Sequence, residues 1–185
     1  ILYKTNEKRR QIAASNLSLC FKNKSKEEVW LIKTDARGNR EWHRTYGGKR
    51  NESGRSVLQT SDNGYIITAR TTTFGAGKDD VWLIKTNSDG KEEWNKTFGG
   101  SNSDYGYSVQ QTTDGGYILI GTTYGNFQSP DEDIIMIKTD NNGNVVWNKK
   151  FDYGIQSNGI ITDLGRSIQQ TTDGGYILIG RNSSW

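Results

Sequence analysis

Short runs of apolar and polar residues alternate along this chain, and the same order of runs returns about every fifty residues. The clearest unit is 81–86, which recurs unchanged at 29–34 and with substitutions at 134–139. Both the odd and the even positions of this unit are mostly apolar, which is typical of a strand buried on two faces. The runs are too short for helices and are followed by turn residues, so the pattern predicts β-strands.

Each repeat predicts four strands joined by turns rich in Asn, Asp and Gly. In the middle copy we expect them at 81–86, 92–98, 107–112 and 117–122. A four-stranded meander cannot bury both of its faces alone, so it must stack on its neighbours. A period of this length therefore predicts a β-propeller, with a linear β-array as the alternative.

We expect the whole chain, 1–185, to form a single domain, which the repeat divides into blades. We expect a partial blade at 1–28 and whole blades at 29–80, 81–133 and 134–185. Propellers typically contain ~4–8 blades. Three blades and a fraction therefore predict a small four-bladed ring, assembly with other chains, or a piece of a longer array.

One spacing is shared by the first turn of every copy: Asp or Asn, Gly three residues later, and Trp four residues after that. It occurs at 35–42, 87–94 and 140–147. The spacing resembles the tryptophan-docking motif of quinoprotein-like β-propellers, and the whole repeat resembles uncharacterised propeller repeats secreted by bacteria and archaea. The resemblance implies an all-β propeller of four-stranded antiparallel blades. In such a propeller each blade is docked on the next by Trp42, Trp94 and Trp147.

Composition limits the partners and the compartment. The net charge of +3 arises from 24 cations and 21 anions that are interspersed, so we expect no nucleic-acid partner. The chain has one Cys, which excludes an internal disulfide, and no run of ~20 apolar residues that would insert in a membrane. Five sequons favour an extracellular or cell-surface glycoprotein. They begin at Asn16, Asn23, Asn51, Asn95 and Asn182.

Catalysis is not expected from this composition. His43 is the sole histidine, so no nucleophile–His–carboxylate set can be assembled across the repeats. The turn aspartates are explained by turn geometry, and the Asn-rich turn 140–144 lacks the later Glu of a calcium loop. We therefore expect no enzyme, no cofactor and no metal site. A quinone-dependent oxidoreductase is the least favoured alternative.

An acidic pair precedes the first strand of each copy, at 27–28, 79–80 and 132–133. If that strand starts near the propeller axis, the pairs ring the channel mouth, either as copied surface charges or as a ligand or cation site. Loops of the same face carry exposed aromatic residues, as sugar-binding surfaces do. The ligand-binding residues expected there are Asp80, Asp104, Tyr105, Tyr124 and Asp133.

Together these features favour a non-enzymatic structural or protein-interaction module. The alternative is a glycan-binding, lectin-like propeller. The expected partner is accordingly a protein or a glycan, and exposed blade edges can also associate with further copies of the chain.

Overall fold

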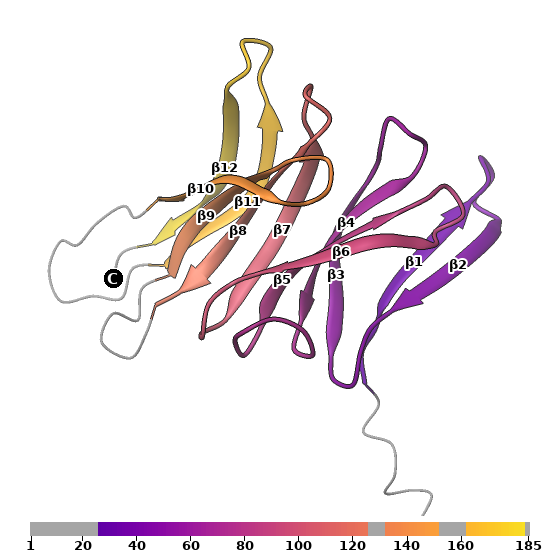
Figure 1. Ribbon diagram of the computed structural model, residues 1–185, viewed down its shortest axis with the longest axis horizontal. Helices are drawn as coiled ribbons and strands as arrows, with labels where there is room; N and C mark the ends of the chain where they lie inside the picture. The colour runs from indigo at the N-terminus through magenta and orange to yellow at the C-terminus, as the bar shows by residue number, and fades with distance from the viewer. Residues whose placement is uncertain (1–25, 126–131, 152–161, 184–185) are drawn as a thin grey trace, which may run out of the picture.

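The computed structural model describes residues 26–125, 132–151 and 162–183, which form twelve β-strands and no helix (Figure 1). All but the last three residues of the predicted partial blade 1–28 lie outside the described residues. In chain order the strands are β1 (Val29–Thr34), β2 (Arg40–Tyr46), β3 (Glu52–Gln59), β4 (Tyr65–Thr71), β5 (Asp80–Thr86), β6 (Glu92–Phe98), β7 (Asp104–Gln111), β8 (Tyr117–Tyr124), β9 (Glu132–Thr139), β10 (Val145–Phe151), β11 (Thr162–Gln170) and β12 (Tyr176–Ser183).

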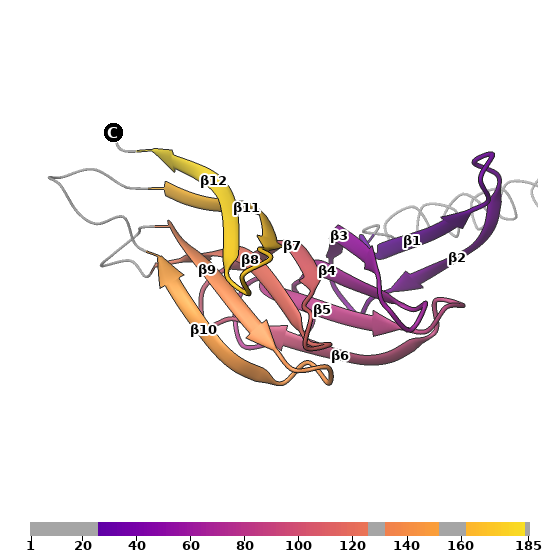
Figure 2. The ribbon, with the colours of Figure 1, turned by 90° about the horizontal axis from the view of Figure 1, so that it is seen from above.

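The strands form four antiparallel units: a first hairpin (β1 and β2), a second sheet (β3-β4-β5-β6), a third sheet (β7-β8-β9-β10) and a last hairpin (β11 and β12). One parallel pair, Thr162 with Glu132, links the last hairpin to the third sheet. The predicted fold class, an all-β propeller of four-stranded antiparallel blades, is confirmed. Figures 1 and 2 show the described units fanned into an open arc, with the two hairpins at its opposite ends.

The sheets begin half a repeat later than the predicted blades 29–80, 81–133 and 134–185. Those blades were assumed to start with the Val-Trp-Leu-Ile strand, but β5 is the third strand of its sheet and pairs with both β4 and β6. The chain changes sheets in the connection between β6 and β7 instead. A repeat determines the period of the blades but not the residue at which a sheet starts.

The innermost strands are β3, β7 and β11, which contact one another from unit to unit. The strands β6 and β10 lie on the outer side of the arc (Figure 2). The expectation that the Val-Trp-Leu-Ile strand starts near the axis is therefore wrong, because β5 and β9 are third from the inside. The acidic residues that precede it do not ring a channel mouth.

Apolar side chains fill the spaces between neighbouring units. From β5, Trp82 and Ile84 pack toward the first hairpin, whereas Val81 and Leu83 pack toward the third sheet. Every residue of β5 is buried. This agrees with the apolar character of both its faces, since a strand enclosed on two sides needs no polar face.

Three tryptophans lie on the outer strand of one unit and contact the next: Trp42, Trp94 and Trp147. Each indole meets a tyrosine ring of the following unit, at centroid distances of 5.8, 5.9 and 5.8 Å. These rings belong to Tyr65, Tyr117 and Tyr176. Two of the indoles also press on a turn glycine with positive φ, and a Cβ on Gly90 or Gly143 would lie 2.9 or 2.7 Å from the ring. A side chain at either turn would therefore be both strained and obstructed.

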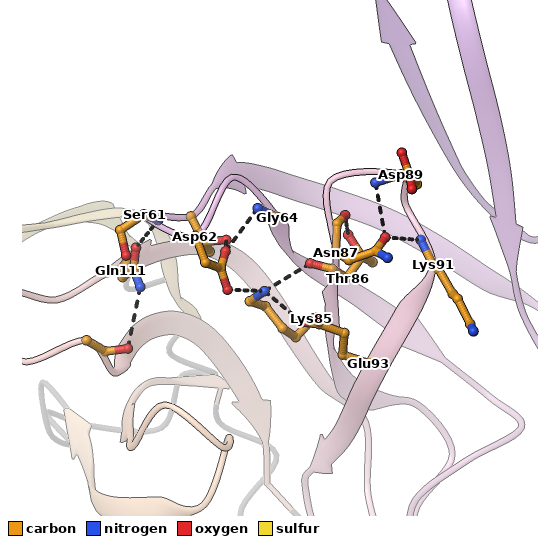
Figure 3. Close-up of polar contacts among 12 residues, drawn as sticks. Ser61, Asp62, Gly64, Lys85, Thr86, Asn87, Asp89, Lys91, Glu93 and Gln111 are labelled. Carbon is orange, nitrogen blue, oxygen red and sulfur yellow. Dashed lines mark hydrogen bonds and ion pairs between the residues drawn. The ribbon is translucent and has the colours of Figure 1, made fainter.

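A buried lysine stabilises the turn end of each complete sheet, and Figure 3 shows the one in the second sheet, Lys85. Lys85 Nζ lies 2.8 Å from Asp62 Oδ2 in the β3–β4 turn and 2.9 Å from Glu93 Oε2, and it donates to Thr86 O at 2.9 Å. We call the bond between this lysine and the turn aspartate the lysine clasp. The third sheet repeats the clasp between Lys138 and Asp114 at 2.9 Å.

Hydrogen bonds from glutamine side chains join consecutive turns. Ser61 N, in the β3–β4 turn, donates to Gln111 Oε1 of the third sheet at 2.8 Å (Figure 3). Thr113 N, in the β7–β8 turn, donates to Gln170 Oε1 of the last hairpin at 2.9 Å. The second sheet is thus held to the third, and the third sheet to the last hairpin, by a polar contact as well as by apolar packing.

Candidate functional site

Most of the predicted site residues meet at the seam between the second and third sheets. The connection from β6 to β7 crosses this seam, where Asp79 and Ser103 form a parallel bridge. Asp104 N donates to Asp79 O at 2.7 Å. The connection begins with two glycines and passes close to a carboxylate, since a Cβ on Gly99 would lie 2.4 Å from Asp80 Oδ1. A residue with a side chain would displace the strand start or the carboxylate.

Asp80 and Asp104 are both buried, and both approach Gly99, because a Cβ there would lie 2.4 Å from Asp80 Oδ1 and 2.7 Å from Asp104 Oδ2. Asp104 Oδ2 accepts a hydrogen bond from Gly100 N at 2.8 Å, and Asp80 Oδ2 accepts one from Gly77 N at 3.0 Å. Asp80 Oδ1 is buried without a hydrogen-bond partner among the described residues. Two carboxylates held this closely away from bulk water are destabilising unless a proton, a water molecule or a cation lies between them.

Asp133 lies two strands away from Asp104 in the third sheet, with Thr123 between them in register. Asp133 is buried, and its Oδ2 lies 2.5 Å from Nζ of the exposed Lys150. This ion pair links β9 to the outer strand β10 and compensates one buried charge. Over the described part of the chain, no group of three or more His, Cys, Asp or Glu residues is arranged to hold a metal ion.

Tyr105 and Tyr124 form a second group beside the seam. Their rings meet edge to face with centroids 5.4 Å apart, and both side chains are partly exposed. Tyr105 OH donates to Asp79 Oδ2 at 3.2 Å, and Ser103 Oγ donates to the same oxygen at 3.1 Å. Burial, and then a hydrogen bond with Glu132, raises the pKa of Tyr124, so its phenol stays protonated at neutral pH.

A groove of about 440 Å³ opens between the outer strands β6 and β10, beside the seam. Part of its lining is apolar and comes from Phe98, Ile135, Ile137 and Val145. The rest is polar or charged and includes Asp104, Asn148, Lys149 and Lys150. The groove therefore offers apolar contact together with charges of both signs.

The structure corrects the expected setting of the acidic site residues. Asp80, Asp104 and Asp133 were predicted at an exposed mouth, but they lie within β5, β7 and β9 and are buried. Tyr105 and Tyr124 stand near strand ends and remain partly exposed, as a ligand-binding role requires.

Sequence reasoning missed the groove and the lysines that border it. A signal was present, because 149–150 is Lys-Lys where the earlier copies have Lys-Thr at 96–97 and Arg-Thr at 44–45. A second lysine that breaks the repeat on an outer strand is the kind of departure that marks a site specific to one copy.

Comparison with known proteins gives a likeness of fold only. No protein-family description and no curated protein sequence matches this chain. Among solved structures, the chain is similar to the crystal structure of a protein of unknown function from Bacteroides caccae, with a TM-score of 0.51 and 14% sequence identity. The likeness covers 83% of this chain and 50% of that chain, so this chain matches about half the length of that protein. No helix in the described ranges is long and apolar enough to cross a bilayer.

Proposed function

We propose that this chain is a non-enzymatic structural and protein-interaction module of an extracellular or cell-surface protein, and that it binds an extended segment of a partner protein in the groove between β6 and β10. The groove is the observation that carries the proposal. Its volume of about 440 Å³ is within the range of recognised binding pockets. The blades that form it are rigidly docked by indole rings, so the groove is preorganised.

The chemistry of the groove favours a peptide segment as the ligand. Ile135, Ile137 and Phe98 offer an apolar surface to side chains of the segment. Lys149 adds a positive charge, while Lys150 is already paired with Asp133. Among the described strands, β6 and β10 each pair on one side only, which leaves backbone groups that an added strand can use. An apolar segment flanked by an acidic residue meets these features.

Two neighbouring valines on β10 provide a matched test. Val145 lines the groove and Val146 does not, and both are exposed. Peptides selected from a random display library against the whole chain are expected to lose affinity about tenfold or more for Val145→Lys, because a charge then enters the apolar lining. They are expected to bind Val146→Lys as they bind the wild type. Equal binding to all three proteins, or a failure to select any peptide, would contradict the proposal.

A glycan ligand is the second candidate, and the pair Tyr105–Tyr124 favours it. Aromatic rings beside a carboxylate and hydroxyl groups offer both stacking and hydrogen bonds to a sugar. A glycan array probed with the wild type and with Tyr105→Ala separates the candidates. Glycan binding that is lost in Tyr105→Ala and retained in Val145→Lys would establish this second function and displace the first.

Glycosylation of the sequons that lie in the described residues would test whether the protein is extracellular. The side-chain amides of Asn95 and Asn182 donate to Glu92 and Asp163, so a glycan there would compete with a structural hydrogen bond. Asn51 is exposed, and its oxygen accepts a hydrogen bond from Glu27 N. In a glycosylating host we expect Asn51 to carry the glycan among these three. Mass spectrometry of wild type and Asn51→Gln would show it, and an unmodified protein would count against a secreted glycoprotein.

A further inference from the structure

The two hairpins at the ends of the arc correspond to the two halves of one complete sheet. In the second and third sheets, the first two strands are β3–β4 and β7–β8, and the last two are β5–β6 and β9–β10. The last hairpin repeats the first half, and the first hairpin repeats the second half. We propose that the last hairpin of one copy and the first hairpin of a second copy join into a four-stranded sheet, and that two copies thereby close a ring of six blades.

The internal strand pairs supply the register of the joint. Tyr65 pairs with Thr86 between β4 and β5, and Tyr117 pairs with Thr139 between β8 and β9. The same register brings Tyr176 of β12 opposite Thr34 of β1. Each strand has an edge that no other described strand covers, because β12 pairs with β11 and β1 pairs with β2. Free edges of matching sequence are templates for strand addition.

The two partners of a further lysine clasp lie at these two edges: Lys33 on β1 and Asp173 in the turn before β12. Lys33 Nζ donates to Glu41 at 2.8 Å and to Thr34 O at 2.7 Å, as Lys85 does to its own neighbours. In the described part of the chain, Lys33 has no turn aspartate within ion-pair distance. Asp173 accepts from Gly175 N at 3.0 Å, as Asp62 does from Gly64 N, but no described lysine reaches it. In the proposed register Lys33 meets Asp173.

The apolar surfaces at the joint match as well. A groove of about 280 Å³ runs between β1 and β3 and is lined by Val29, Leu31 and Val57. Between the third sheet and the last hairpin, side chains of β8 fill the space that corresponds to this groove. There Ile118 and Ile120 pack on Ile168 of β11. The counterpart of Ile120 on β12 is Ile179, which is 67% exposed whereas Ile120 is 0% exposed. Docking β12 beside β1 brings Ile177 and Ile179 onto Val57.

The proposed joint also gives Gly175 and Gln59 the contacts that their counterparts have inside the chain. Gly64 and Gly116 are crowded by the neighbouring strand, since a Cβ would lie 2.1 and 2.2 Å from its carbonyl oxygens. Gly175 meets only atoms of its own turn. Gln59 corresponds to Gln111 and Gln170, which accept bonds from turns of the preceding unit. In the joined sheet, Gln59 is placed to accept from the β11–β12 turn of the other copy.

The proposed number of copies uses the count of sheets in the described residues. These residues contribute two complete sheets and two complementary halves, the equivalent of three blades. The two hairpins of one chain lie at opposite ends of the arc (Figure 2), so in this proposal each joins a hairpin of another copy. Head-to-tail contacts of this kind close into a ring when the rotation allows it. Propellers contain ~4–8 blades, which two copies satisfy with six and which one copy or three copies do not.

Light scattering of the full chain measures the assembly directly. One chain has a mass of 20.8 kDa, so the expected mass of the pair is about twice that value. Ile179→Lys places a charge in the joint at a position that is exposed in the single chain, and we expect it to return the mass to that of one chain with an unchanged circular dichroism spectrum. Val146→Lys, which changes an exposed valine outside the joint, is expected to remain a pair. A wild-type mass of one chain, or a series of larger masses, would overturn the proposal.

A charge exchange tests the register without relying on a disruptive variant. Lys33→Asp and Asp173→Lys each bring like charges together at both joints of a ring, and each alone is expected to have the mass of one chain. An equimolar mixture restores opposite charges at both joints and is expected to regain the mass of a pair. A mixture that stays at the mass of one chain overturns the proposal.

Discussion

Strands β1 and β5 contain the same six residues, Val-Trp-Leu-Ile-Lys-Thr, in different surroundings. Trp82 on β5 is 2% exposed, whereas Trp30 on β1 is 59% exposed; Ile84 and Ile32 differ in the same way, at 0% and 42%. β5 lies between β4 and β6 with a unit on each face, while β2 is the one described strand that pairs with β1. Identical sequence therefore gives the same strand, and the neighbouring strands decide whether it is core or surface.

The lysines of the two strands differ in the same sense. The side chain of Lys85 is 4% exposed and that of Lys33 is 38% exposed. Burial by itself would lower the pKa of Lys85, but hydrogen bonds to Asp62 and Glu93 outweigh it and the pKa is raised. At Lys33 a hydrogen bond to Glu41 raises the pKa. A lysine at this position can be buried because the added neighbours supply acceptors as well as apolar surface.

The largest difference between the two strands is expected at the tryptophans. In the Ile179→Lys background, where we expect single chains, Trp82→Ala should lower the free energy of unfolding by about 3–5 kcal/mol, because it leaves a cavity between two units. Trp30→Ala should cost less than about 1 kcal/mol in that background, since its ring is mostly in solvent. Urea denaturation of both variants checks this. Equal losses would show that the first hairpin is covered as the second sheet is.

A smaller difference is expected at the lysine clasp. Lys85→Met removes the cation shared by Asp62, Glu93 and a backbone carbonyl, and should lower the free energy of unfolding by about 2 kcal/mol. The matched variant Lys33→Met should change the stability of single chains less, because the Lys33 side chain is 38% exposed and water can replace much of its hydrogen bonding. An equal loss of unfolding free energy in Lys85→Met and Lys33→Met would contradict the predicted difference between the two lysines.

Acid should weaken the clasps through their aspartates. Hydrogen bonds from Lys85 and Thr60 lower the pKa of Asp62 to about 2, and those from Thr112 and Lys138 do the same for Asp114. The ordinary value is 3.8, so each clasp stabilises the fold fully above about pH 4 and is lost as the pH falls toward 2. Both carboxylates are more than half exposed, so screening reduces each contribution to about 1 kcal/mol.

The urea midpoint at pH 6 and at pH 2.5 measures this loss. We expect Asp114→Asn to lose less stability on acidification than the wild type, because its clasp is already broken at pH 6. A variant that loses as much as the wild type would show that other carboxylates control the acid response.

The smallest effect is expected at the seam. Asp80→Asn removes one of two buried carboxylates that face each other near Gly99, and should raise the free energy of unfolding by up to about 1 kcal/mol. The corresponding residue of the first copy is Glu28, which is exposed and paired with Lys26 at 2.6 Å. Glu28→Gln should therefore bring no gain. Calorimetric melting of both variants tests the difference, and a destabilised Asp80→Asn would imply that a cation or water depends on that charge.

The sequence predicts the strands of this fold well because each is bounded by turn residues whose local geometry is decisive. Asp35, Asn87 and Asp140 accept hydrogen bonds from the backbone of their own turns, and this requires no knowledge of tertiary contacts. Which strands share a sheet depends on where the chain crosses between blades. The crossing at Gly99 and Gly100 looks like any other loop in the sequence.

The site was only partly predictable for a related reason. The acidic residues Asp80, Asp104 and Asp133 recur with the repeat, which made them visible, but their burial depends on the position of β5, β7 and β9 within the sheets. The groove arises between two strands that are far apart in sequence, β6 and β10. Neither its volume nor its lining follows from the residues of one repeat.

Amide hydrogen exchange in the two identical hexapeptides tests the central claim most directly. Their intrinsic exchange rates are nearly the same, so any difference in protection reports the neighbouring strands. In single chains of Ile179→Lys, the amides of β5 should be protected close to the global limit, while alternate amides of β1 exchange rapidly. In the wild-type pair the two strands should become alike. Equal protection of β1 and β5 in single chains would contradict the claim that neighbours, and not the strand's own residues, create the core.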